Sequence, residues 1–199
     1  GRAGRGLKRR ATPMNRTAVL QLLRAHAARP LDPHEAAMTA ATIQFAEEHA
    51  DCLLRSCLPG HLTGSAWIIS PDRTRTLLTH HRKLYKWLQL GGHADGDPDL
   101  LAVALREARE ESGLTRLRPL ALEPFDVDRH RIPERKAEPA HWHYDLRFMI
   151  EADPEAPLVV SSESKELAWV EVVRVTALNP EESMARMVRK TRQRGAMAP

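Results

Sequence analysis

Residues 92–114 read GHADGDPDLLAVALREAREESGL, and this stretch predicts one well-bounded helix. Asp97 is expected as its N-cap, with Pro98 at the first helical position, where the missing N–H is not needed. Gly113 is expected just after the last turn, because glycine readily adopts the left-handed conformation that ends many helices. The helix is therefore predicted from about Pro98 to Ser112, behind a strand that stops at Gly91 and Gly92.

The predicted helix carries its acidic residues on one face. Glu107, Glu110 and Glu111 are three and four residues apart, so their side chains crowd together. A separate apolar stripe is expected to pack on a sheet: Leu101, Leu105, Ala108 and Ser112. A solvated charged face would explain the glutamates too. However, a strand, a glycine loop and a helix make a rigid frame, and clustered carboxylates suit a hard divalent ion that bridges to phosphate.

The rest of the chain alternates between helical and extended patterns. Residues 17–58 have helical spacing, interrupted at 30–33, and a second helix is expected over 33–50 with Asp32 as its N-cap. Short strands are expected at 66–69, 76–79, 86–90, 120–127, 144–150 and 167–173, and a last helix follows Asn179-Pro180 to about Lys190. This mixture predicts an α/β or α+β layered domain.

Composition indicates a soluble globular protein. Of the 199 residues, 42% are hydrophobic and 28% are charged, which excludes a disordered chain. No apolar run approaches the roughly 20 residues that span a bilayer, and no signal-peptide core is present. Cys52 and Cys57 fall in a stretch predicted as helical, without metal-like partners nearby. A cytoplasmic protein with reduced thiols is the simplest interpretation.

The positive net charge is concentrated at the two ends of the chain. Residues 1–16 carry six basic groups and no acid, and residues 181–199 carry a net +3. Taking both from the total of +4 leaves −5 for residues 17–180. Because the body is acidic, nucleic-acid binding is not the expected function. Met14 is a plausible natural start, so residues 1–13 are expected to be a disordered or added basic extension.

The stretch 92–114 resembles the Nudix box of the MutT-like pyrophosphohydrolases. The matching positions are Gly92, Arg106, Glu107, Ala108, Glu110, Glu111, Gly113 and Leu114. The box normally has a glutamate where this chain has Pro98, and many relatives have proline where this chain has Leu90. The resemblance implies an α/β/α sandwich with a mixed sheet. Together with the sequence patterns, it divides the chain into four expected parts: the extension 1–13, a helical section 14–60, the Nudix domain 61–180, and a helix with a basic tail over 181–199.

The resemblance also implies a site and a reaction. Glu107, Glu110 and Glu111 would hold Mg²⁺, with Mn²⁺ as an alternative, helped by the backbone carbonyl of Gly91 or Gly92. Arg106 would orient a glutamate. The general base would be a box glutamate or a loop glutamate, for which Glu163 is the main candidate and Glu166 the second. The expected reaction is attack by water on a phosphorus of a diphosphate linkage in a nucleoside diphosphate derivative.

A polar stripe that begins before the strand predicted over 144–150 and runs into it is the candidate substrate contact. His141, His143, Asp145 and Arg147 alternate, so they would share one side of a strand. They could line a substrate cleft or face solvent at a sheet edge. A transition-metal site is not expected there, because no third ligand has a telling spacing. Asp128 and His130, in what reads as a long loop, could join a pocket.

Three other functions compete with hydrolysis of a small diphosphate compound. A non-catalytic nucleotide sensor often lacks box glutamates, whereas all three are present. An RNA 5′-end pyrophosphohydrolase would use the basic ends to hold the polyanion. The isomerase branch of the superfamily would need a cysteine in the catalytic core, and both cysteines lie elsewhere. The expected partner is a small molecule, with no membrane, and the N-terminal helical section could form a homodimer interface.

Overall fold

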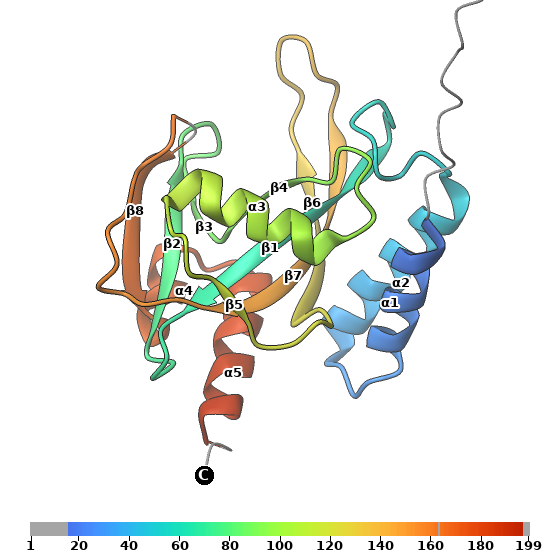
Figure 1. Cartoon of the computed structure of the whole chain (residues 1–199). Helices are drawn as coiled ribbons and strands as arrows, with labels where there is room; N and C mark the ends of the chain where they lie inside the picture. The colour runs from blue at the N-terminus through green and yellow to red at the C-terminus, as the bar shows by residue number, and fades with distance from the viewer. Residues whose placement is uncertain (1–15, 163, 197–199) are drawn as a thin grey trace, which may run out of the picture.

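The structure, a computed structural model, describes residues 16–162 and 164–196 (Figure 1). In chain order the elements are α1 (Arg16–Ala27), α2 (Pro33–Glu48), β1 (Gly60–Ile69), β2 (Arg75–His81), β3 (Trp87–Leu88), β4 (Leu90–His93), α3 (Leu100–Ser112), β5 (Arg118–Pro119), β6 (Asp126–Ile132), β7 (His141–Glu151), β8 (Ser164–Glu171), η1 (Val172–Arg174), α4 (Val175–Leu178) and α5 (Glu182–Ala196). The extension expected over residues 1–13 lies outside the described residues.

Strand β1 is the centre of a mixed, eight-stranded sheet. It runs parallel to β7 and antiparallel to β2 and β4, and all ten of its residues are buried. Strands β5 and β6 pair with β7, while β3 and β8 pair with β2. The predicted α+β class with a mixed sheet and an N-terminal helical section is confirmed.

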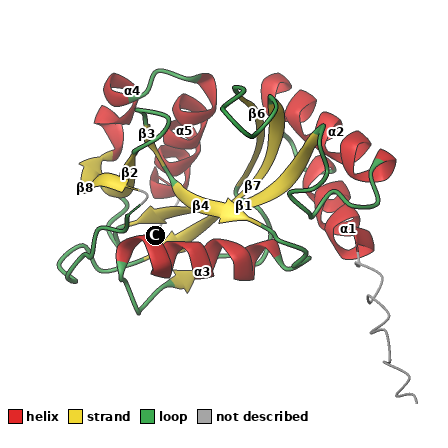
Figure 2. Cartoon of the chain, turned by 90° about the horizontal axis from the view of Figure 1, so that it is seen from above, coloured by secondary structure: helices red, strands yellow, loops and turns green. Residues whose placement is uncertain are grey.

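Neighbouring residues of β1 contribute to two cores on opposite faces of the sheet. Ala66 and Ile68 belong to one core, together with Val103 of α3. Trp67 belongs to the other core, together with Met187 of α5. Because side chains alternate along a strand, α3 and α5 cover opposite faces of the sheet (Figure 2). This arrangement is the expected α/β/α sandwich.

The N-terminal helices pack beside the β6–β7 side of the sheet (Figure 1). Helix α2 begins as predicted: the side chain of Asp32 accepts a hydrogen bond from the backbone N–H of Glu35. Phe45 of α2 stacks on Tyr144 of β7, with ring centroids 4.1 Å apart. The helix ends at Glu48, so the prediction that Cys52 and Cys57 are helical is wrong, and both thiols lie buried in the turns that follow.

Two boundaries around α3 differ from the prediction. The N-cap is Asp99, whose side chain accepts from the backbone N–H of Ala102 at 3.0 Å; Asp97 caps the turn before it. The preceding strand does not stop at the glycines, because β4 continues through them to His93 and pairs with β1. The C-terminal end is as predicted: Gly113 has φ 72° and its N–H bonds to the carbonyl of Arg109.

The strand predicted over 120–127 is wrong. The extended segments are β5 and β6, because pairing with β7 decides which residues are extended. Asp128 and His130, predicted in a loop, therefore lie in β6, opposite Asp145 and His143. Within the described residues, no helix has the length and apolar character that a bilayer crossing requires.

Candidate active site

Glu107 lies directly against Gly92, where α3 approaches β4. A Cβ atom on Gly92 would be 2.4 Å from both Cδ and Oε2 of Glu107. Gly91 faces the other side of the sheet, where a Cβ would be 2.2 Å from Oγ of Ser65. Gly92 therefore lets the carboxylate of Glu107 approach the strand on one face, and Gly91 leaves space for Ser65 of the paired strand β1 on the other.

Arg106 ties the same carboxylate to the strand. Its Nη2 donates to Oε1 of Glu107 and to the backbone carbonyl of His93, both at 3.1 Å. The guanidinium is thus in the position expected of a residue that orients a glutamate.

The other two glutamates have different environments. Glu110 is exposed, whereas Glu111 is 8% exposed. The apolar stripe of α3 is also rotated from the prediction. Its buried residues are Leu100, Val103, Ala104, Ala108, Glu111 and Ser112, while Leu101 and Leu105 are partly buried. Glu111 therefore lies at the boundary between the core and the carboxylate face, and Glu110 is the outermost of the three.

These residues fit a hard divalent ion by donor chemistry. The three carboxylates are three and four residues apart on one helix, and Glu107 touches Gly92, whose backbone carbonyl is a further oxygen donor. Among the described residues, two groups of side chains have potential metal-ligand atoms within 4.8 Å of one another, and the three carboxylates of α3 are not one of them. Closing around an ion would require a side-chain rotation, for which the exposed Glu110 has room.

The opposite face of the sheet is polar at its centre, around Asp145. Its Oδ1 accepts hydrogen bonds from Thr63 and Ser65 of β1, both at 2.8 Å. Its Oδ2 accepts from Nε2 of Gln89 at 3.1 Å and from Nε of Arg147 at 2.9 Å. Asp145 is thus fully hydrogen-bonded and 1% exposed.

Arg147 extends this arrangement to the C-terminal helix. It contacts Asp126 and Asp128 of β6 at 3.4 and 3.5 Å, and Arg186 of α5 binds Asp126 through two bonds of 2.7 and 2.8 Å. Burial alone would raise the pKa of Asp126, but the hydrogen bond from Arg186 and the charge of Arg147 hold that pKa below its usual value. Asp145 and Arg147 are therefore interior, which contradicts a solvent-facing edge for this half of the stripe, whereas His141 and His143 are half-buried.

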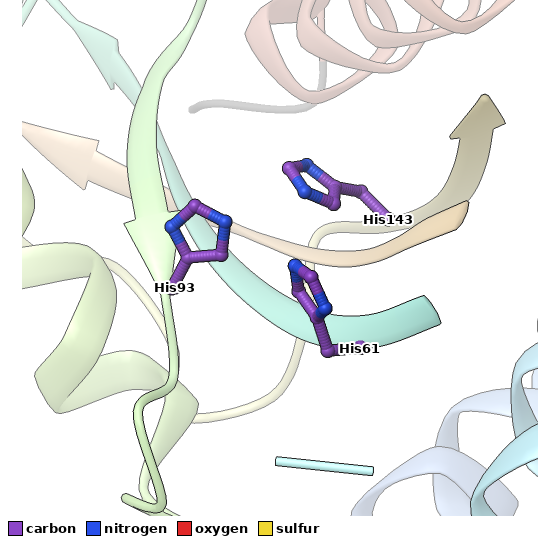
Figure 3. A group of neighbouring side chains, drawn as sticks. All are labelled: His61, His93 and His143. Atoms are coloured by element: carbon purple, nitrogen blue, oxygen red, sulfur yellow. The ribbon is translucent and has the colours of Figure 1, made fainter. Parts of the chain in front are cut away.

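The other end of the stripe belongs to a histidine cluster. His143 of β7 lies beside His61 of β1 and His93 of β4, with ring centroids 4.8–5.0 Å apart (Figure 3). His141 lies next to them, with its Nε2 3.2 Å from Nε2 of His143. Burial lowers the pKa of His61 and of His93 to about 4, and it lowers the pKa of His143 further. Burial therefore favours the neutral form of the His61, His93 and His143 rings.

A NUDIX domain model matches residues 61–191. The chain belongs to the Nudix family. Two solved structures share the fold. One is an Ap4A hydrolase of C. elegans in a binary complex, with 17% identity and a TM-score of 0.52, covering 68% of this chain and 97% of that one. The other is the dihydroneopterin triphosphate pyrophosphohydrolase of E. coli, with 17% identity and a TM-score of 0.53, covering 65% of this chain and 92% of that one. No curated protein sequence matched the chain.

The other candidate residues of this Nudix-type hydrolase differ in how far they are buried. Glu163 lies outside the described residues, and Glu166 is exposed on β8. Asp145 and Arg147 are enclosed, whereas His141 lines a cavity of about 80 Å³ together with His61 and His93. Cys57, expected to have no metal-like partners, has His49 and Asp51 within 4.8 Å. Burial raises the pKa of its thiol to about 11.

His61 and His93 had not been singled out from the sequence of this Nudix protein. His61 is aligned with His143 by the parallel pairing of β1 and β7, and His93 is brought alongside by the antiparallel pairing of β4 with β1. The repeated Gly-His pairs at 60–61 and 92–93 were the available signal. Neither pair indicates which strands will become neighbours.

Proposed function

We propose that this Nudix-type hydrolase cleaves a diphosphate linkage in a nucleoside diphosphate derivative, with Mg²⁺ as its metal. The observation that carries the proposal is the contact of Glu107 with Gly92, on a helix that carries Glu110 and Glu111 three and four residues further along. Three carboxylates with a backbone carbonyl nearby form a donor set of the kind that holds Mg²⁺ on a phosphate substrate.

Each residue has a defined part in the proposed reaction. Glu107, Glu110 and Glu111, with the carbonyl of Gly91, hold the metal. A bound Mg²⁺ neutralises phosphate oxygens and lowers the pKa of the attacking water. Arg106 positions Glu107 through its 3.1 Å contact. A box glutamate or Glu163 takes the proton from the water as it attacks phosphorus.

The substrate class is supported by what related folds act on. The names of the two similar structures refer to Ap4A and to dihydroneopterin triphosphate, both of which contain phosphoanhydride bonds. In this chain His141 lines the cavity of about 80 Å³ and is the proposed substrate contact; its Nε2 lies 3.2 Å from Nε2 of His143. RNA is a weaker candidate, because Arg186 and Lys190 of the basic C-terminal section are engaged with Asp126 and Glu35.

A panel of diphosphate compounds, assayed with Mg²⁺, tests the proposal. Wild type is compared with Glu107→Gln, Glu110→Gln and Glu111→Gln, and Glu171→Gln, an exposed glutamate at the end of β8, is the matched control. Cleavage of at least one compound should fall by a hundredfold or more (about 2.7 kcal/mol) in the box variants and stay unchanged in the control. If a compound is bound but never cleaved, the protein is a sensor.

A further inference from the structure

The histidine cluster contains a buried side chain that is poorly satisfied within the described part of the chain. His61 is 5% exposed, and neither of its ring nitrogens makes a hydrogen bond of normal geometry to a described residue. Buried polar groups are nearly always satisfied by protein, water or an ion, so an exception of this kind requires an explanation. Its ring is grouped with those of His93 and His143, from two other strands (Figure 3). One candidate nitrogen from each of the three lies within 4.8 Å of the others.

The hydrogen bonds of His141 determine which nitrogen of His143 has a lone pair available. Nδ1 of His141 lies 2.9 Å from the carbonyl oxygen of Pro139, which can only accept, so Nδ1 carries the hydrogen. In the neutral ring Nε2 of His141 then accepts, and Nε2 of His143 donates across the 3.2 Å between them. The lone pair of His143 is therefore on Nδ1. This carbonyl–His–His chain resembles the outer-shell contacts that orient metal-binding histidines.

We propose that His61, His93 and His143 form a binding site for a divalent transition metal of the Zn²⁺ class, distinct from the carboxylate site on α3. Three imidazoles suit Zn²⁺ and are poor ligands for Mg²⁺. Imidazole nitrogens bound to Zn²⁺ at roughly 2.0–2.1 Å in a tetrahedron are about 3.3 Å from one another. The three candidate nitrogens lie within 4.8 Å of one another, so each pair must approach by about 1.5 Å at most.

The surroundings of the cluster leave room for a fourth ligand. The cavity of about 80 Å³ beside His61 and His93 is lined also by Glu138 and Arg55. That volume holds two waters at roughly 30 Å³ each, so three protein ligands and a water would complete the site. The charge of Arg55 is offset by its two-bond pairing with Asp95, at 2.7 and 2.8 Å.

The two metal sites would lie on opposite faces of β4. Gly92 faces Glu107 of α3, and the next residue, His93, is opposite Thr63 on the face that carries His61 and His143. This separation makes the proposal testable independently of the hydrolase activity. Excess Mg²⁺ should occupy the carboxylates and leave the imidazoles available to Zn²⁺.

The test measures Zn²⁺ binding by calorimetry to the EDTA-dialysed full chain in excess Mg²⁺. We expect one Zn²⁺ per chain, and at least a hundredfold weaker binding in His61→Gln, His93→Gln and His143→Gln. His80→Gln, which changes a histidine of β2 outside the cluster, should bind as wild type does. His141→Gln should weaken binding by roughly 10–100-fold, the usual loss for an outer-shell partner.

Co²⁺ provides a second readout that does not depend on variants folding. Bound to wild type, it should give the strong visible bands of a four- or five-coordinate nitrogen site, without a thiolate charge-transfer band. A thiolate band, with binding lost in Cys57→Ser, would assign the ion to the group of His49, Asp51 and Cys57 and overturn the proposal. So would Zn²⁺ binding that is absent in wild type, or that persists in all three histidine variants.

Discussion

Replacing Gly92 with alanine should damage the active site through one contact. The new methyl would lie 2.4 Å from Cδ and Oε2 of Glu107 and 2.9 Å from its Cγ. Ordinary van der Waals contact begins near 3.4 Å, so the carboxylate must move by about 1 Å. A displacement of that size at a reacting centre costs about a hundredfold in kcat/KM, or about 2.7 kcal/mol. The loss of stability should be small, because the atoms that must shift belong to the far end of a flexible side chain.

A double-mutant cycle isolates that contact. Kinetics on a cleaved diphosphate compound and urea unfolding are measured for Gly92→Ala, Glu107→Ala and the double variant. Without the Glu107 side chain the new methyl has space, so Gly92→Ala should cost under about 0.5 kcal/mol in that background, in both activity and stability. Equal losses in both backgrounds, or full activity in Gly92→Ala, would refute the contact as the cause.

Three further changes test other parts of the structure. Asp126→Ala should cost about 3–5 kcal/mol in urea unfolding, because it leaves Arg186 buried without its main partner. In metal-free protein, His61 and His93 should each lower the free energy of unfolding by about 1–2 kcal/mol between pH 7 and pH 5. Their folded pKa of about 4 lies below the unfolded value, so unfolding takes up protons as the pH falls. The variant with glutamine at both positions should show a flatter dependence of stability on pH. Arg106→Gln should lower kcat about tenfold with little change in KM, since the residue positions a glutamate; a change in KM alone would mean that it binds substrate.

The parts of the fold that depend on residues close together in the sequence were predictable. Asp32 before Pro33 and Gly113 after the glutamates fix the ends of two helices through local hydrogen bonds and backbone conformation. The spacing of the box residues likewise predicted neighbouring carboxylates on α3, although their environments differ: Glu110 is exposed and Glu111 is buried. These features need no information about which strands become neighbours.

The parts that depend on strand pairing were not predictable. Asp126 and Asp128 read as the end of a strand and the start of a loop, but pairing with β7 places both opposite Arg147 and Asp145, beneath Arg186. Arg186 read as part of a basic tail, although it is fully buried. A single sequence does not show that Arg186 will pair with Asp126, a carboxylate 60 positions earlier in the chain.

The most direct test of the central claim is cleavage in ¹⁸O-labelled water, with Mg²⁺, of whichever diphosphate compound the enzyme uses best. Attack by water on phosphorus places one ¹⁸O in the phosphate group of only one of the two products, as mass spectrometry would show. The reaction should require Mg²⁺ and should be at least a hundredfold slower in Glu110→Gln. Cleavage that places no ¹⁸O on phosphorus, or that proceeds equally well without Mg²⁺ or in Glu110→Gln, would contradict the account.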